Sequence, residues 1–393
     1  MLAPLSSLDA YRRDAVTVDG AGVDDATVAR WLESASRLEH AALVKGPDRE
    51  RLLAGLLAQL GVVPFPSTPV SAETLAATIS ATAEAMEDQA YLHLAYSTLA
   101  SLLRVIPENE VLVRGRVVAG QARTARQLGD TRAATFFYET VEQLGEEYGY
   151  PELKGRAWLG YGMLARLRGA FPEARKQFTR VVELAGAADD SVLWAHHELM
   201  IAAAAASDYD TAAMHGWKAF KGASTPKQET DALINLAQLL LEAGHPRTAL
   251  RGFAAALARN PIPRFLLPTL GGAAYAAASA LPTPAARAVV RNFAERVECL
   301  VKNLGNGARL AWTTASALVE ISEALTLVGE PTASQRFSER AGELARSRGF
   351  HALVYRLENP PKVAAPATLA PATTAILAEV DELEGAELVG ASR

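Results

Sequence analysis

The sequence has few of the residues that stabilise small extracellular folds. It contains a single cysteine, Cys299, so no disulfide can form within the chain, and this usage is typical of a reducing compartment. Aromatic residues make up only 7% of the chain, and alanine is the dominant apolar residue. Because alanine is the best helix former and is poor in strands, this composition favours closely packed helices over a sheet.

Long hydrophobic runs and a strong excess of one charge are also missing. The most apolar stretch, residues 265–286, is interrupted by Pro268, Pro282 and Pro284, whereas a membrane span needs about 18 uninterrupted apolar residues. The first residues include no apolar segment of signal-peptide length. The formal net charge is −5, without the basic excess usual in a nucleic-acid-binding domain. We therefore expect a soluble, cytoplasmic protein that binds neither membrane nor nucleic acid.

Proline positions, helical patterns and changes in composition predict four parts of the chain. Residues 1–66 carry amphipathic helical patterns that align with no repeat, and residues 67–70 end a connector whose three prolines forbid a continuous helix. Residues 71–358 read as consecutive helix pairs. Residues 359–393 form a Pro/Ala-rich linker followed by an acidic tail. The high ratio of arginine to lysine is typical of a GC-rich bacterial genome.

Four segments between 115 and 261 share one pattern of helix, short turn and helix. Their turns begin at 129, 169, 207 and 244, at intervals of 40, 38 and 37 residues. Each second helix carries a small residue and, four positions later, usually an aromatic one: Ala134, Ala174, Ala212 and Ala249, then Tyr138, Phe178, Gly216 and Phe253. Helices approach closely only where side chains are small, and one pair cannot bury its own apolar face. The pairs must therefore stack.

This pattern resembles the tetratricopeptide repeat (TPR). The segment 158–186 carries the resemblance best, because residues of the family's kind stand at its Trp, Leu, Gly, turn Gly, Ala and Phe positions: Trp158, Tyr161, Gly162, Gly169, Ala174 and Phe178. Pro261 matches the family's closing proline, whereas the spacing exceeds the usual 34 residues. The resemblance, firm over 115–261 and degenerate elsewhere, implies an all-α, right-handed superhelical solenoid of stacked antiparallel helix pairs.

The resemblance also implies a function. In this family the first helix of each pair lines a concave groove, and this groove binds a protein or peptide. The resemblance therefore implies a scaffold that has no catalytic activity. Projected onto this sequence, the groove takes carboxylate-binding arginines and two apolar contacts: Arg116, Arg123, Arg126, Arg156, Arg166, Met163 and Trp194. Because guanidinium groups bind carboxylates in a bidentate manner, the expected ligand is an acidic amphipathic segment. The alternatives are a solvated surface for the arginines and a place in the core for Met163 and Trp194.

The chain itself contains such a segment at its C-terminal end. The tail combines acidic and apolar residues: Glu379, Asp381, Glu382, Glu384 and Glu387 with Ile376, Leu377, Val380 and Leu383. The linker 359–375 is long enough to let the tail fold back. We hypothesise that the tail competes with an outside partner for the arginine-lined groove, since tethering raises its effective concentration.

No motif indicates catalysis, a cofactor or a metal. The string GYGMLA at 160–165 matches a dinucleotide fingerprint in letters, but it lies within an expected helix rather than between a strand and a helix. None of the seven histidines pairs at the i, i+3 or i+4 spacing of helical metal ligands. Cys299 has no partner base in the sequence, and neither a GxSxG elbow nor a P-loop occurs. We therefore predict a non-enzymatic scaffold without a cofactor.

Two other interpretations stay open. The longer repeat spacing is similar to that of bacterial regulators that bind a signalling peptide and control a transcription-related partner, although residues 1–66 show no helix-turn-helix pattern with a basic recognition helix. An enzyme that uses a cavity between helices is the third interpretation. A buried pocket lined by ionisable groups with shifted pKa values would favour it.

Overall fold

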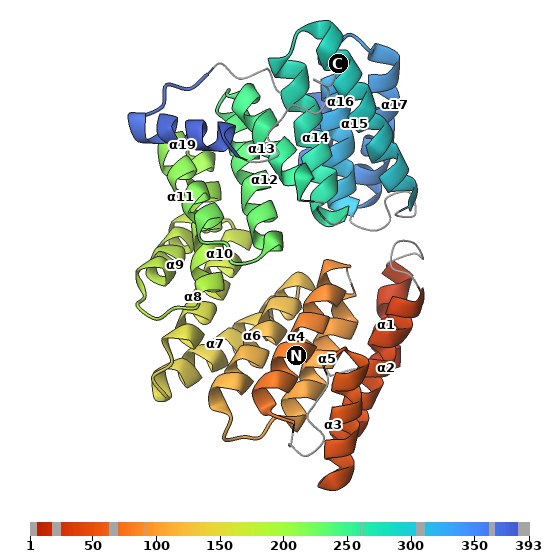
Figure 1. The fold of residues 1–393 in the computed structure, drawn as a ribbon, viewed down its shortest axis with the longest axis vertical. Helices are drawn as coiled ribbons and strands as arrows, with labels where there is room; N and C mark the ends of the chain where they lie inside the picture. The colour runs from red at the N-terminus through yellow and green to blue at the C-terminus, as the bar shows by residue number, and fades with distance from the viewer. Residues whose placement is uncertain are drawn as a thin grey trace. The chain divides into compact units, whose positions relative to one another are not determined.

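A computed structural model describes residues 6–17, 25–62, 70–89, 91–259, 261, 263–303, 311–360 and 366–383. Within these ranges all regular secondary structure is helical, in 19 helices, α1 to α19 (Figure 1). Contacts divide the chain into two compact units, Met1–Ala195 and His196–Arg393. None of the described helices is both long and apolar enough to cross a membrane.

The first unit contains three N-terminal helices followed by consecutive antiparallel helix pairs. Its elements are α1 (Ser7–Thr17), α2 (Asp25–Ala41), α3 (Pro47–Gln59), α4 (Ala72–Asp88), α5 (Leu92–Val105), α6 (Val111–Gln127), α7 (Thr131–Glu147), α8 (Pro151–Leu167), α9 (Phe171–Glu183) and the first residues of α10 (Asp189–Ala205). Helices α1 and α2 pack against α5, and α1–α3 share one apolar core with α4, α5 and the start of α6. The N-terminal helices are therefore part of this stack.

The second unit continues the pairs and ends with a helix that returns to earlier ones. It holds the rest of α10, then α11 (Tyr209–Lys221), α12 (Pro226–Glu242), α13 (Pro246–Ala258), α14 (Pro263–Ala280), α15 (Thr283–Asn303), α16 (Ala311–Leu327), α17 (Pro331–Ser347), α18 (His351–Glu358) and α19 (Pro371–Asp381). We call the even-numbered helices from α4 to α18 the first helices of the pairs, and the odd-numbered helices from α5 to α17 the second helices. One large core runs through this unit from α10 to α19.

The turns between paired helices lie where the sequence predicts them. Gly169 joins α8 to α9 with a φ of +76°, a left-handed conformation that glycine adopts without a steric penalty. Gly129, Gly244 and Gly329 make the same turn in other pairs. Ser207 adopts a φ of +59° between α10 and α11, where an L side chain is strained. A common turn geometry thus produces the repeated antiparallel pairs.

Small residues allow the helices to approach closely, as the pattern predicts. Ala134, Ala174, Ala212 and Ala249 are all buried. Aromatic rings of three second helices occupy the space where glycines of first helices lack a Cβ atom: Tyr138 against Gly160, Phe178 against Gly162 and Phe253 against Gly272. Gly216 stands where the fourth ring is missing, and Met200 Sδ and Leu236 Cδ1 lie 2.8 and 3.1 Å from its Cβ position. The prediction of an all-α, TPR-like stack of antiparallel helix pairs is confirmed.

Candidate binding surface on the first helices

The arginines predicted for a groove lie on first helices of the first unit, and Arg116 on α6 joins two neighbouring first helices. Its Nε and Nη2 atoms donate to the two carboxylate oxygens of Glu152 on α8, at 2.7 Å each, and its Nη1 donates to Glu73 on α4 at 2.6 Å. Burial acts to raise the pKa of Glu152, but the hydrogen bonds from Arg116 and the charge of Arg156 outweigh it and lower that pKa. Arg116 therefore ties α4, α6 and α8 together.

Arg123 makes a second forked pair, with Glu87 at the end of α4. Its Nε and Nη2 atoms donate to Glu87 at 3.0 and 3.1 Å, and its Nη1 donates to Glu84 at 3.1 Å. Thr124 and Gln127 donate to the same Glu87 carboxylate at 2.8 and 2.6 Å. Glu87 is only 7% exposed, so this network satisfies a buried charge in the way such groups require.

The other five predicted residues lie on α6, α8 and α10. Arg156 pairs with Glu152 at 3.2 Å and with Asp190 on α10 at 2.9 Å. Arg126 is hydrogen-bonded to the phenol of Tyr138. Met163, Arg166 and Trp194 are, like Arg126, partly exposed. The structure thus uses Arg116, Arg123 and Arg156 to connect first helices, and it places the other four predicted residues on α6, α8 and α10.

Sequence reasoning identified these arginines but missed the carboxylates that pair with them. Arg116 and Glu152 are 36 residues apart, as are Glu87 and Arg123. The starts of successive first helices are 39 residues apart from α4 to α6 and 40 from α6 to α8, so each arginine meets a carboxylate about one helical turn from its equivalent position. A search for opposite charges one repeat less one helical turn apart would have found both pairs.

In the second unit, the first helices carry a different cluster, in which carboxylates outnumber arginines. Arg356 on α18 forms a forked pair with Glu323 on α16, with donor–acceptor distances of 3.0 and 2.7 Å. Its Nη1 lies 3.9 Å from Glu320 Oε1, also on α16. Glu320 is buried, its Oε2 has no hydrogen-bond partner within the described structure, and this oxygen fills the Cβ position of Gly271 on α14.

Burial raises the pKa of Glu320 to about 7, although the charge of Arg356 acts to lower it. The negative charges of Glu323 and of Glu242 on α12 add to the rise. Tyr275 on α14 also has a raised pKa, first through burial and then through the charge of Glu323. The cluster therefore holds one carboxyl group that changes its protonation state near neutral pH.

We expect Glu320→Gln to remove a pH dependence of stability. Because the pKa of Glu320 rises from 4.5 in an ordinary environment to about 7 in the folded protein, ionisation opposes folding, and stability falls as the pH rises through this range. At pH 8 the variant should be more stable than the wild type by about 1–3 kcal/mol, and at pH 5 the two should be nearly equal. Denaturant unfolding at both pH values measures this difference.

Glu323→Gln is the matched control, since it removes the forked partner of Arg356 instead. It should destabilise the protein at both pH values, because it leaves a partly buried guanidinium poorly paired. A Glu320→Gln variant that keeps the wild-type slope between pH 5 and pH 8 would contradict the assignment.

Two histidines that looked scattered in sequence are brought together. Nδ1 of His196 on α10 lies 2.9 Å from Nδ1 of His215 on α11. Burial, with smaller contributions from the charges of His215 and Lys218, lowers the pKa of His196 to about 4. At neutral pH one ring therefore donates and the other accepts. No group of three or more His, Cys, Asp or Glu residues suited to a metal occurs in the described part of the chain.

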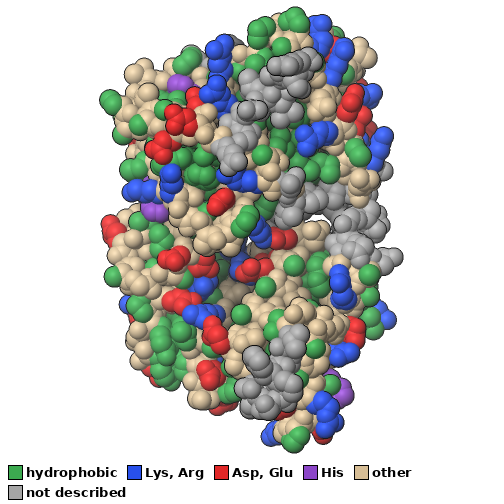
Figure 2. All heavy atoms as spheres, in the orientation of Figure 1, with side chains coloured by type: hydrophobic (Ala, Val, Ile, Leu, Met, Phe, Trp, Pro, Cys, Tyr) green, Lys and Arg blue, Asp and Glu red, His purple; other side chains and the backbone are tan. Residues whose placement is uncertain are grey.

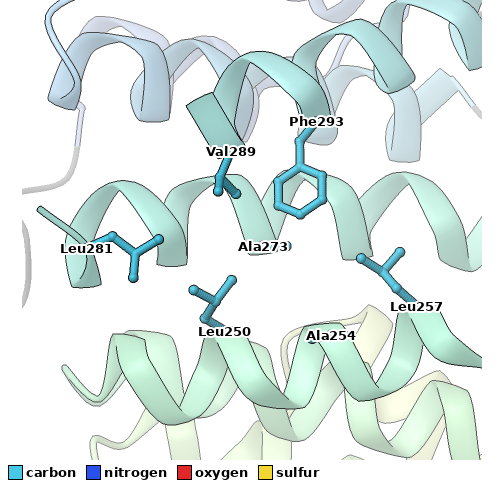
Figure 3. A pocket seen from close by; sticks show the side chains of 7 residues that line it. All are labelled: Leu250, Ala254, Leu257, Ala273, Leu281, Val289 and Phe293. Atoms are coloured by element: carbon cyan, nitrogen blue, oxygen red, sulfur yellow. The ribbon is translucent and has the colours of Figure 1, made fainter. Parts of the chain in front are cut away.

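An apolar cavity of about 10 Å³ lies between α13, α14 and α15 (Figure 3). Its lining is made of aliphatic side chains and one ring: Leu250, Ala254, Leu257, Ala273, Leu281, Val289 and Phe293. A water molecule needs a cavity of about 10–15 Å³ together with polar partners. This space is therefore a packing defect rather than a ligand site.

On the face shown in Figure 2, acidic and basic side chains are interspersed.

No family model and no curated protein matches the sequence. Among solved structures, the chain is similar to the TPR domain of P58(IPK), with 13% identity over 90% of this chain and 95% of that one and a TM-score of 0.24. A TM-score this low means that the two structures do not superpose as wholes. The TPR-like fold of this chain is therefore inferred from its own turns, helix pairs and small-residue crossings.

Proposed function

We propose that this chain is a non-catalytic scaffold that binds a protein or peptide on the first helices of its first unit. The carrying observation is the set of forked ion pairs that ties α4, α6 and α8 together through Arg116 and Glu152. These pairs make adjacent first helices a rigid support. Rigid helices that present partly exposed side chains are suited to binding an extended or helical segment.

The partner that fits this surface best is an acidic amphipathic segment. Arg126 and Arg166 supply guanidinium groups for its carboxylates, and Met163 and Trp194 supply apolar contacts; all four are partly exposed. Arg116, Arg123 and Arg156 act as positioning residues, because their guanidinium groups already pair with carboxylates of the protein itself. The N-terminal helices α1–α3 share the core of the stack, which favours a scaffold over the regulatory sensor that the repeat spacing also suggests.

We expect Arg126→Glu/Arg166→Glu to weaken partner binding at least tenfold, because the change replaces attraction by like-charge repulsion. The probe is a pool of peptides selected by display on the full-length protein, with affinities measured by fluorescence anisotropy. Selected peptides should combine acidic and apolar residues.

Arg132→Glu/Arg175→Glu is the matched control, with the same charge change at exposed positions of the second helices α7 and α9. It should leave peptide binding unchanged. Equal binding by both double variants would remove the site from these helices, and selection of basic peptides would refute the charge complementarity.

A further inference from the structure

The last described helix, α19, does not continue the stack after α18. It packs against α11 and α13, two second helices that come much earlier in the chain (Figure 1). Thr248 and Asp381, which meet in this contact, are 133 residues apart. The tail was expected on the arginine-bearing helices of the first unit. Its described residues instead lie on the second unit's own second helices.

Specific hydrogen bonds hold the start of α19. Asp210 on α11 accepts the backbone N–H of Ala370 at 2.9 Å and the hydroxyl of Thr373 at 2.6 Å. The hydroxyl of Thr373 and the N–H of Ala370 lower the pKa of Asp210. Just before the helix, the N–H of Ala367 donates to the carbonyl oxygen of Ala243 at 2.9 Å. The helix therefore enters the surface in one orientation.

An apolar stripe and two basic residues receive the rest of the helix. Thr373, Ile376 and Val380 lie at i, i+3 and i+7, so they share one face of α19, and all three are buried. Val380 Cγ1 lies 3.6 Å from the Cβ position of Gly252 on α13. At the other end, Lys221 pairs with Glu379 and Arg251 with Asp381, each at 3.5 Å. The surface thus matches an acidic amphipathic helix in shape and in charge.

The contacts of α19 are sufficient to order this helix, but they are few enough that another helix could displace it. An 11-residue helix is marginal in water by itself, so docking must provide the ordering. Both ion pairs are largely exposed, with side chains 58% and 51% accessible in one and 43% and 34% in the other. Exposed pairs of this kind contribute little. Most of the attachment therefore comes from the three buried side chains and from the hydrogen bonds at the start of the helix, while the tether keeps α19 close to its site.

We propose that the surface formed by Asp210, Lys221, Thr248, Arg251 and Gly252 is a binding site for an acidic amphipathic helix of a partner protein, and that α19 occupies it as an internal competitor. The partner helix carries small or apolar residues at i, i+3 and i+7 and carboxylates near its C-terminal end. This site lies on second helices of the second unit, so it goes beyond the surface proposed above. A tethered competitor sets a threshold, because an outside helix must exceed the effective concentration of α19.

The test uses full-length protein and a fluorescent synthetic peptide of residues 366–383. Val380→Asp places a charge on the buried face of α19 and should release it. We expect hydrogen exchange in residues 371–381 to accelerate, and the peptide to bind at least tenfold more tightly than it binds wild-type protein, whose site is occupied. Ala378→Asp adds the same charge on the exposed face of α19 and should change neither measurement.

Further variants make the result specific to this surface. In the Val380→Asp protein, Arg251→Glu should weaken peptide binding, and a scrambled peptide should not bind. Arg126→Glu/Arg166→Glu should have no effect, so failure of the first-unit site and failure of this one are distinguishable. The melting temperature of each variant reports whether the stack remains folded.

Three results would overturn the proposal. In the first, α19 is released by Val380→Asp and the peptide still does not bind. In the second, exchange in residues 371–381 is the same in wild type and variant. In the third, wild-type protein forms a dimer that the Val380→Asp change abolishes, which would assign the surface to the tail of a second copy.

Discussion

Replacing Phe178 by alanine is expected to lower the free energy of unfolding of the first unit by about 3–5 kcal/mol. The ring is fully buried and fills the space beside Gly162, whose Cβ position lies 2.7 Å from Phe178 Cδ1. Truncation removes this apolar area and leaves a cavity between α8 and α9. Denaturant unfolding followed by circular dichroism measures the loss, and hydrogen exchange in α8 and α9 places it.

Gly162→Ala tests the same contact from the other side. Alone it should destabilise by about 1–2 kcal/mol, because the added methyl group meets the ring and the gain in helix propensity offsets only part of this. Combined with Phe178→Ala, the methyl group enters the vacated space, so the two changes should be non-additive by about 1 kcal/mol or more.

Gly55→Ala on α3 is the control, since its Cβ would lie 3.4 Å from Arg37 Nη1, an ordinary contact with a flexible side chain. It should be neutral or slightly stabilising. If Gly162→Ala and Gly55→Ala had equal effects, the close approach of α8 and α9 would be wrong.

Arg123→Gln should destabilise the first unit by about 3 kcal/mol. The change leaves Glu87 buried with Thr124 and Gln127 as its remaining donors, which satisfy hydrogen bonds without neutralising the charge. Thermal and denaturant unfolding measure the loss. Adding Glu87→Gln should recover much of it, because a neutral pair no longer needs a counter-charge.

Arg51→Gln provides the comparison. Arg51 pairs with Asp48 at 3.4 Å, but these side chains are 81% and 74% accessible, and such a pair contributes at most about 0.5 kcal/mol. Equal effects of Arg123→Gln and Arg51→Gln would contradict a structural role for the Glu87 network. Because a change at Arg123 is expected to destabilise the protein, its effect on partner binding would be difficult to interpret. Partner binding is therefore tested at Arg126 and Arg166.

The helix pairs could be predicted from sequence because their signals are local. A left-handed glycine such as Gly169 and a small residue such as Ala174 five positions later are required by the turn and by the crossing. In the sequence, Gly160 and Gly162 match the glycine spacing of a dinucleotide-binding loop. Their actual role, receiving the rings of Tyr138 and Phe178, follows from the same local pattern once a helix is recognised.

The site was less predictable because its contacts join different pairs. Face periodicity placed Arg116 and Arg123 correctly on one helix face, but it does not show which carboxylates stand on the next first helix. The cluster of Glu320, Glu323 and Arg356 lies where the repeat pattern is degenerate, so no alignment indicates it. The seven site residues and the domain bounds of 66 and 358 stay predictions.

The tail shows the same limit. Its composition indicated an acidic amphipathic segment, and α19 is one. Its position depends on Gly252, which admits Val380, and on Asp210, which holds Thr373. Neither residue stands out in a sequence read alone.

The ion pairs between first helices also restrict how this stack can have grown. Helix α4 contributes only carboxylates to them, α6 only arginines, α8 both Glu152 and Arg156, and α10 Asp190. Helix α6 carries no carboxylate, so tandem duplication of the α6–α7 pair would leave Arg116 of the first copy without Glu152 and Arg123 of the second copy without Glu87. The charges therefore record a fixed order of repeats, and lengthening this part of the protein requires compensating substitutions on both sides of every inserted pair.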